Sequence, residues 1–195
     1  MDIKAHKNCV FGIQASGKTY FAQNGLAAQF ENPLVFVVNK DDVDGWLAVP
    51  RAHVYLAQNR LAIGGEFALF MKQAHKWATE GKIDAIFIDE ADLFFNSNYD
   101  LDPVTLDLVL NHRHIGARGV ALVFMTRRPQ DIPTKIVESS KFLFIFKLEG
   151  ANAIQRFKEI NPQIPPLIDI LDYKRHNFVV KEIGKDPYIH KPITA

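Results

Sequence analysis

Eight consecutive residues near the start of the chain have the types and spacing that bind a nucleoside triphosphate. They fit the pattern G-x-x-x-x-G-K-[ST] at every fixed position, and they are Gly12, Ile13, Gln14, Ala15, Ser16, Gly17, Lys18 and Thr19. The two glycines allow the backbone to curl so that successive N–H groups point at phosphate oxygens. Lys18 is expected to reach the β- and γ-phosphates, and the Thr19 hydroxyl to ligate Mg²⁺.

Two adjacent carboxylates end an apolar run in the middle of the chain. In phosphate-loop enzymes the acid at the tip of such a strand holds Mg²⁺, and Asp89 is the candidate for that role. Glu90 follows it and is placed to polarise an attacking water. Asp89 lies 71 residues after Lys18, a spacing that suits ATPases with an extra strand between the two motifs and a catalytic glutamate. Asp84 and Asp92 are expected to be solvated or to cap backbone groups.

Charge changes sign along the next part of the chain. Seven acids and no Lys or Arg occur between Ile83 and Leu110, whereas the following 18 residues contain no acid and four arginines, Arg113, Arg118, Arg127 and Arg128. The first stretch is suited to a cation and the second to anions. His112 and His114, at i, i+2 spacing with no other His or Cys cluster nearby, are interpreted as surface histidines rather than metal ligands.

The elements that must position these residues alternate between short apolar runs and amphipathic segments, which indicates an α/β fold with a mainly parallel sheet flanked by helices. The predicted strands are 8–12, 34–39, 85–89, 120–126, 142–148 and 177–183. The predicted helices are 18–29, 66–79, 103–112, 134–139 and 151–160, and residues 164–166 are predicted to form a turn. Residues 1–184 are expected to form one domain, and residues 185–195 a tail.

Composition narrows the class of protein further. The chain has 195 residues, the size of one domain, and its net charge of +1 excludes a polycation that coats nucleic acid. Its single cysteine, Cys9, can form neither an intramolecular disulfide nor a multi-cysteine zinc site, and it is expected to be a buried core thiol in a reducing compartment. No apolar run approaches the ~20 residues that span a bilayer. Phe94 and Phe95 are expected in the core, with a surface loop as the alternative.

The segment from Asn111 onward resembles the FtsK/HerA superfamily of DNA-pumping P-loop ATPases. In that family a helix ends in an Arg- and Gly-rich turn, and the next strand closes with a T-Q-R-P-like signature. This chain reads Thr126-Arg127-Arg128-Pro129, so that Arg127 replaces the usual polar glutamine. The resemblance extends over residues 8–158 and implies a RecA-like (ASCE) core with strand order 5-1-4-3-2.

Within that superfamily, the chain is most similar to the genome-packaging ATPases of membrane-containing double-jelly-roll viruses. The resemblance implies an Mg²⁺-dependent ATPase that translocates double-stranded DNA, without regard to sequence, into a procapsid. It also implies a homo-oligomeric ring, pentamer or hexamer, in which Arg113 or Arg118 completes the site of a neighbouring subunit, with Arg113 favoured. Arg127 would contact nucleotide, a neighbour or DNA. A capsid vertex or membrane protein is a further expected partner, the chain itself is not expected to be transmembrane, and the expected location is host cytoplasm or the virion vertex.

Three alternatives remain open from the sequence. The first is a cellular or conjugation-type DNA translocase. The second is a nucleoside kinase, because the segment from Ile88 to Phe95 is similar to the acidic motif of thymidine kinases; their four-cysteine zinc module has no counterpart here. The third is a structural subunit that binds nucleotide without hydrolysing it, against which the intact Glu90 argues.

Overall fold

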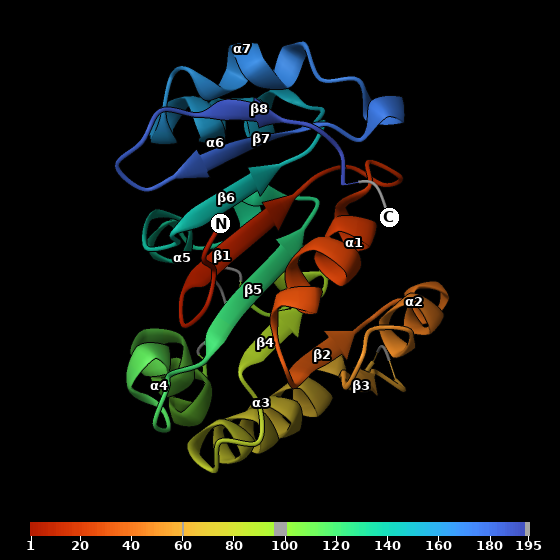
Figure 1. Cartoon of the computed structure of the whole chain (residues 1–195), viewed down its shortest axis with the longest axis vertical. Helices are drawn as coiled ribbons and strands as arrows, with labels where there is room; N and C mark the ends of the chain where they lie inside the picture. The colour runs from red at the N-terminus through yellow and green to blue at the C-terminus, as the bar shows by residue number, and fades with distance from the viewer. Residues whose placement is uncertain (60, 96–100, 194–195) are drawn as a thin grey trace.

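An eight-stranded sheet of order β3-β2-β4-β5-β1-β6-β7-β8 forms the centre of the computed structural model, which describes residues 1–59, 61–95 and 101–193 (Figure 1). The strands are β1 Lys7–Phe11, β2 Pro33–Val37, β3 His53–Leu56, β4 Ala85–Ile88, β5 Ala121–Thr126, β6 Phe142–Ile145, β7 Phe178–Glu182 and β8 Tyr188–His190. Neighbouring strands from β3 to β6 are parallel, and β7 and β8 are antiparallel additions. The order β6-β1-β5-β4-β2 confirms the expected 5-1-4-3-2 core and the α/β RecA-like fold class.

The central strands are buried on both faces, which explains why they appear in the sequence as nearly continuous apolar runs. Successive side chains point to opposite faces. In β4, for example, Ile86 and Ile88 belong to one hydrophobic core, whereas Ala85 and Phe87 belong to the other. This alternation makes a three-layer molecule with helices on both sides of the sheet.

Helices of unequal size cover the two faces. The helices are α1 Lys18–Phe21, α2 Val43–Leu47, α3 Ile63–Thr79, α4 Pro103–Asn111, α5 Thr134–Glu138, α6 Ala151–Ile160 and α7 Ile164–Asp169. Side chains from α3 to α7 enter one core; those of α1, α2 and the turns after α1 enter the other. In Figure 1, α1 crosses in front of the sheet, and α6 and α7 lie at the end that carries β7 and β8.

The local structure differs from the sequence predictions at several places. Pro165 and Pro166 open α7 rather than form a turn, because the first helical turn needs no N–H donors. The predicted helix 18–29 is helical throughout, as expected, but it changes from one α-turn to the π-helical turn Ala22–Leu26 and then to the 3₁₀ turn Ala27–Gln29. Strand β3 was missed, as was α2; both are short. Within the segment expected as a tail, Tyr188–His190 pair with β7 as β8.

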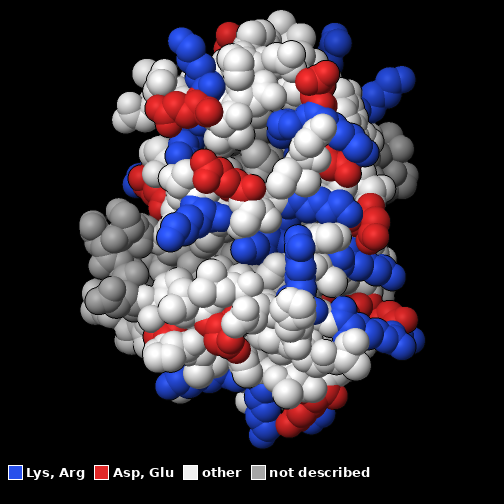
Figure 2. Space-filling model, turned by 90° about the vertical axis from the view of Figure 1, so that its left-hand side faces the viewer, with Lys and Arg blue, Asp and Glu red and all other residues white. Residues whose placement is uncertain are grey.

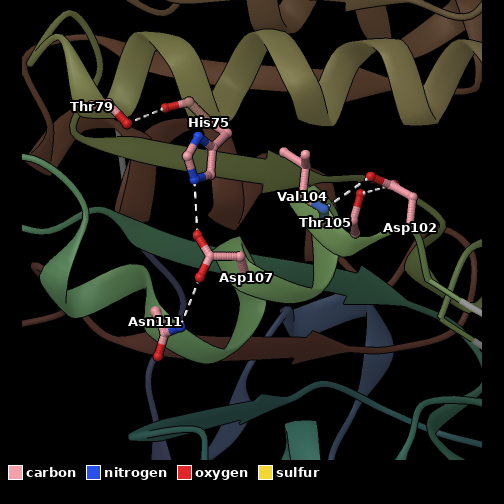
Figure 3. Close-up of polar contacts among 7 residues, drawn as sticks. All are labelled: His75, Thr79, Asp102, Val104, Thr105, Asp107 and Asn111. Atoms are coloured by element: carbon pink, nitrogen blue, oxygen red, sulfur yellow. Dashed lines mark hydrogen bonds and ion pairs between the residues drawn. The ribbon is translucent and has the colours of Figure 1, made fainter.

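Helix α4, which leads to the arginine-rich turn, is anchored at its start and in its middle (Figure 3). Asp102 caps its N-terminus by accepting hydrogen bonds from the backbone N–H groups of Val104 (3.1 Å) and Thr105 (3.3 Å). Further along, a carboxylate oxygen of Asp107 lies 2.9 Å from Nε2 of His75 on α3. These contacts fix the position of the turn that follows α4.

The structure tests three predictions about which side chains are buried. His112 is not a surface histidine: it is 2% exposed, and its Nδ1 lies 2.9 Å from the carbonyl oxygen of Val120. The prediction was wrong because the loop that returns the chain into β5 covers the ring and offers it a carbonyl. Phe94 and Phe95 are buried, as expected, and Phe94 stacks on Phe67 at 4.1 Å between ring centroids. Cys9 is fully buried, as expected, and burial raises the pKa of its thiol to about 12.

Candidate functional site

The glycine-rich loop between β1 and α1 adopts a tight curl that only small residues permit. Gly17 precedes α1 with a left-handed backbone (φ 93°), and Ala15 also has a positive φ of 61°. A side chain at Gly12 would lie 2.5 Å from the Ser16 hydroxyl and 2.8 Å from Cβ of Phe146. The loop can therefore approach a ligand with its backbone, as a phosphate cradle requires.

The loop opens onto a cavity of about 820 Å³ at the carboxyl ends of the parallel strands. In open α/β sheets, ligands bind in the crevice outside these strand ends. All residues from Ile13 to Thr19 line the cavity, and so do the two acidic candidates, Asp89 and Glu90. The structure therefore brings together the two motifs that the sequence separates by about 70 residues.

Two buried charges of opposite sign contribute to this cavity. Lys18 is 8% exposed, and Asp89 is 3% exposed. Burial raises the pKa of Asp89 to about 6, while the charge of Lys18 partly counteracts that effect. The N–H of Asp89 donates to the carbonyl of Phe36 at the end of β2 (3.0 Å), which fixes the backbone at the tip of β4. A buried carboxylate at this point is suited to hold a divalent cation.

Arg127 connects the glycine-rich loop to the second acid. Its Nη2 lies 2.6 Å from Oε1 of Glu90, and its Nη1 donates to Oε1 of Gln14 at 3.4 Å. Strand order explains this placement: β5 lies between β1 and β4, so the residue after β5 reaches both neighbouring loops. Next to it, Thr126 donates to Asp92 (2.5 Å) and accepts from the N–H of Arg128 (2.9 Å), which orients the turn. Asp92 is thus a hydrogen-bond acceptor inside the site region.

The cavity also contains residues that sequence reasoning missed. Asn39, Asp41 and Asp42 come from the turn after β2, and the negative charge of Asp42 contributes to the raised pKa of Asp89. The two adjacent acids Asp41 and Asp42, four and five residues after the buried strand β2, could have indicated this part of the site from the sequence. His176 and Ile193 come from the C-terminal part of the chain, and no motif marks them.

The two candidate arginines of the turn after α4 lie away from this cavity. Arg113 belongs to the 3₁₀ turn His112–His114, before β5, and its guanidinium contacts His6, which precedes β1. Arg118 is exposed in the loop that follows. Since both precede β5, they lie at the amino-terminal edge of the parallel strands, opposite the cavity. The chain itself does not bring them to its own phosphate loop.

The residues of the cavity fit a triphosphate with a divalent cation. The hydroxyl of Ser16 is buried and has no hydrogen-bond partner among the described residues. A bound phosphate oxygen would satisfy this hydroxyl, as buried polar groups require. Thr19 and Asp89 supply oxygen donors of the kind that Mg²⁺ prefers. Among the described residues, no group of three or more His, Cys, Asp or Glu is placed to hold a metal by itself. A cation here would depend on phosphate and water oxygens as further ligands.

These features define the class of fold: the chain has the fold of RecA-like P-loop NTPases, with the glycine-rich loop, the acidic strand end and the residue after β5 converging at one edge of the sheet. No protein-family model matches the chain, and no curated protein sequence matches it. No helix within the described ranges is long and apolar enough to cross a membrane.

Solved structures are similar over nearly the whole chain. The genome packaging NTPase B204 from Sulfolobus turreted icosahedral virus 2, in complex with ATP-gammaS, has a TM-score of 0.79 at 16% identity, covering 97% of this chain and 98% of that one. EssC (ATPases 2 and 3) from Geobacillus thermodenitrificans has a TM-score of 0.62 at 12% identity, covering 93% and 38%. The pCW3 conjugation coupling protein TcpA has a TM-score of 0.56 at 14% identity, covering 96% and 60%. The resemblance to packaging and FtsK/HerA-type ATPases is thereby confirmed at the level of the fold.

Proposed function

We propose that this chain is an Mg²⁺-dependent ATPase that translocates double-stranded DNA, and that it packages a viral genome into a procapsid. The observation that carries the ATPase part is the convergence of the glycine-rich loop, Asp89 and Glu90 on one cavity, with Lys18 buried beside them. Within one subunit, an arrangement of this kind supplies the groups that phosphoryl transfer to water requires, except a positive charge that a neighbouring subunit would provide.

The loop backbone and the charged and hydroxyl side chains beside it have distinct roles in this proposal. The backbone N–H groups of the loop and Lys18 bind the β- and γ-phosphates. Thr19 and Asp89 would hold Mg²⁺, which neutralises phosphate charge. Glu90 orients the attacking water and accepts its proton. Arg127 already bonds to Glu90 and Gln14, so it lies close enough to sense whether a γ-phosphate is present.

The nucleobase would lie beside the ring and aliphatic side chains that line the cavity. Tyr20 directly follows the loop, and its side chain is 45% exposed. His176 packs against Gly17, where a side chain at position 17 would lie 3.0 Å from His176 Nδ1. Ile193 lies over Gly25, where a side chain would come within 2.3 Å of its Cδ1. Two ring side chains and one aliphatic side chain offer the apolar, stackable surroundings that a purine base requires.

The DNA-moving part of the proposal is supported by the similar structures. B204 is described as a genome packaging NTPase and matches this chain from end to end, whereas EssC and TcpA are longer proteins. In this proposal, subunits form a homo-oligomeric ring of five or six, and Arg113 or Arg118 of one subunit completes the site of the next. The ring would work at a capsid vertex, with a capsid or membrane protein as partner, in the host cytoplasm or the virion.

The test is the ATPase rate with and without duplex DNA, measured over a range of protein concentrations. We expect stimulation by DNA and a steep dependence on concentration, because a shared site needs assembly. Glu90→Gln should lower the rate by about 10²–10⁴-fold while retaining nucleotide binding, and Lys18→Ala should lose binding itself. Glu31→Gln and Lys158→Ala, at exposed positions outside the cavity, are the matched controls. Turnover at the wild-type rate in both site variants would refute the catalytic assignment.

The same assay separates two of the alternatives, and co-purification separates the third. ADP formation that requires thymidine rather than DNA would indicate a nucleoside kinase. Tight ATP binding without hydrolysis, at assembling concentrations and with DNA present, would indicate a structural nucleotide-binding subunit. A cellular or conjugation-type translocase would show the same DNA-stimulated activity, and is distinguished by whether the protein co-purifies with capsid components.

A further inference from the structure

Four basic side chains gather at the edge of the sheet opposite the nucleotide cavity. This basic cluster consists of His6, Lys7, Arg113 and Lys141. Lys7 begins β1, Lys141 immediately precedes β6, and Arg113 lies in the turn that leads to β5. Because β5, β1 and β6 are adjacent, the sheet itself brings these positions together, and the N–H of Lys141 donates to the carbonyl of Lys7 at 2.7 Å.

The imidazole of His6 is contacted by a cation on each side. Nη2 of Arg113 lies 3.3 Å from Nδ1, and Nζ of Lys141 lies 3.1 Å from Nε2. Guanidinium and ammonium groups only donate hydrogen bonds, and a neutral imidazole accepts at one nitrogen alone. One of the two contacts therefore sets a donor against a donor. The cluster contains more donors than its own atoms can satisfy.

The cluster has no carboxylate bonded to it within the described part of the chain. None of the four residues takes part in an ion pair there, although Lys7 is only 8% exposed. Burial, followed by the charges of Lys141 and Arg113, lowers the pKa of His6, and the charge of exposed Asp2 acts against this effect. Burial and the charge of Arg113 likewise lower the pKa of Lys7.

The surrounding surface strengthens the attraction for an anion. The face in Figure 2 is the left-hand side of Figure 1, where α4, α5 and the chain's N-terminus lie. Lys and Arg side chains form a band across its middle, and acidic side chains are fewer between them (Figure 2). A ligand that approaches this face meets positive potential before it reaches the cluster.

We propose that the basic cluster binds a phosphate group. Arg113 and Lys141 flank one imidazole, and Lys7 begins the strand beside them. This arrangement suits a ligand with several oxygens and more than one negative charge, because a phosphate can accept from Arg113 and Lys141 at once. A carboxylate offers two oxygens and a single charge, and would leave donors unused. The phosphate would come from a DNA backbone or from the nucleotide of an adjacent subunit. Which source applies rests on the proposed function, whereas phosphate binding itself does not.

The first experiment follows the His6 imidazole by NMR during titration with inorganic phosphate, with sodium chloride at matched ionic strength as the reference. A His6→Gln variant identifies the signal. We expect a saturable shift of His6 that persists in Lys18→Ala, since the phosphate loop lies at the other edge of the sheet, and that disappears in Lys141→Gln. Lys185→Gln is the matched control, because Lys185 already pairs with Glu182 at 2.8 Å. No saturable shift, or a shift unchanged in Lys141→Gln, would overturn the proposal.

A second pair of measurements separates the two sources. If the source is DNA, Lys141→Gln should reduce the magnitude of the slope of log affinity against log salt by about one, for duplex DNA of mixed sequence. If the source is a neighbour's nucleotide, this slope is unchanged and the ATPase rate falls only at assembling concentrations. A variant that alters neither quantity would overturn the functional assignment of the cluster. An inactive wild-type protein would refute the proposed ATPase and leave the His6 shift intact.

Discussion

Replacing His112 should change how the stability of the protein depends on pH. The ring is buried, and burial lowers its pKa from 6.5 to about 4; the hydrogen bond to Val120 works against this, and nearby Lys7 and Arg113 add to the lowering. Between pH 6.5 and 4 the unfolded chain therefore binds a proton that the folded chain does not. The contribution of His112 to the unfolding free energy is therefore fully present above pH 6.5 and is lost as the pH falls from 6.5 to about 4.

The size of the effect follows from the two pKa values. The interval between 6.5 and about 4 corresponds to about 3 kcal/mol of unfolding free energy. Asp89 acts in the opposite sense over an overlapping range, because burial raises its pKa to about 6 and acid relieves the cost of its buried charge. The wild-type profile alone is thus a sum of opposing contributions. The difference between wild type and a His112 variant removes the contribution of Asp89.

His112→Gln is the informative substitution, since its amide can still donate to the Val120 carbonyl but does not titrate. In urea unfolding at pH 7.5, the variant should be less stable than wild type. At pH 4.5 the difference in unfolding free energy between variant and wild type should be about 2–3 kcal/mol more favourable to the variant than at pH 7.5. In melting experiments this amounts to about 5–10 °C for a chain of this length. His114→Gln, an exposed position on the same turn, is the control. An equal difference between variant and wild type at both pH values would refute the reasoning.

Three further predictions concern Asp89, Asp102 and Gly17. Asp89→Asn should raise the melting temperature of the nucleotide-free protein at pH 8, because the buried charge is removed; an unchanged or lower value would contradict this. Asp102→Ala should cost about 1 kcal/mol in urea unfolding, because two amides at the start of α4 lose their acceptor. Gly17→Ala should cost about 1–2 kcal/mol through its left-handed backbone and weaken binding of a fluorescent ATP analogue. His176→Ala in that background should restore part of the stability, because it removes the two ring atoms at 3.0 and 3.2 Å and leaves only Cβ of residue 176 at 3.2 Å. No recovery would mean that the ring contacts do not contribute to the loss.

The core of the fold was predictable because each element carries a strong local signal. The strands that became β1, β2, β4, β5 and β6 are buried on both faces, and such burial demands continuous apolar runs. Strands β3 and β8 lie at the two edges of the sheet, where one side of the backbone is unpaired and burial is incomplete. Short, half-exposed segments need little hydrophobicity, so the sequence pattern gives little indication of them.

The residues of the candidate site likewise fall into those that the sequence predicted and those that it did not. The glycine-rich loop and the acidic strand end were found from sequence because their chemistry requires specific residue types at fixed local spacing. His176 and Ile193 were missed because they enter the cavity through tertiary packing alone, from about 160–175 residues downstream of the loop. The surface assignment of His112 was wrong for a related reason: periodicity places a residue on a helix face but does not say which loop will cover it.

By itself, the amino-acid order determined that a phosphate cradle and an acidic strand end exist, because each depends only on residues that are close together in the sequence. Only the tertiary structure decided which distant groups meet. The strand order set Arg127 between Gln14 and Glu90, and it gathered His6, Lys7 and Lys141 with Arg113 at the far edge. Contacts of that kind depend on which strands lie side by side, and strand adjacency results from burying both faces of the whole sheet at once.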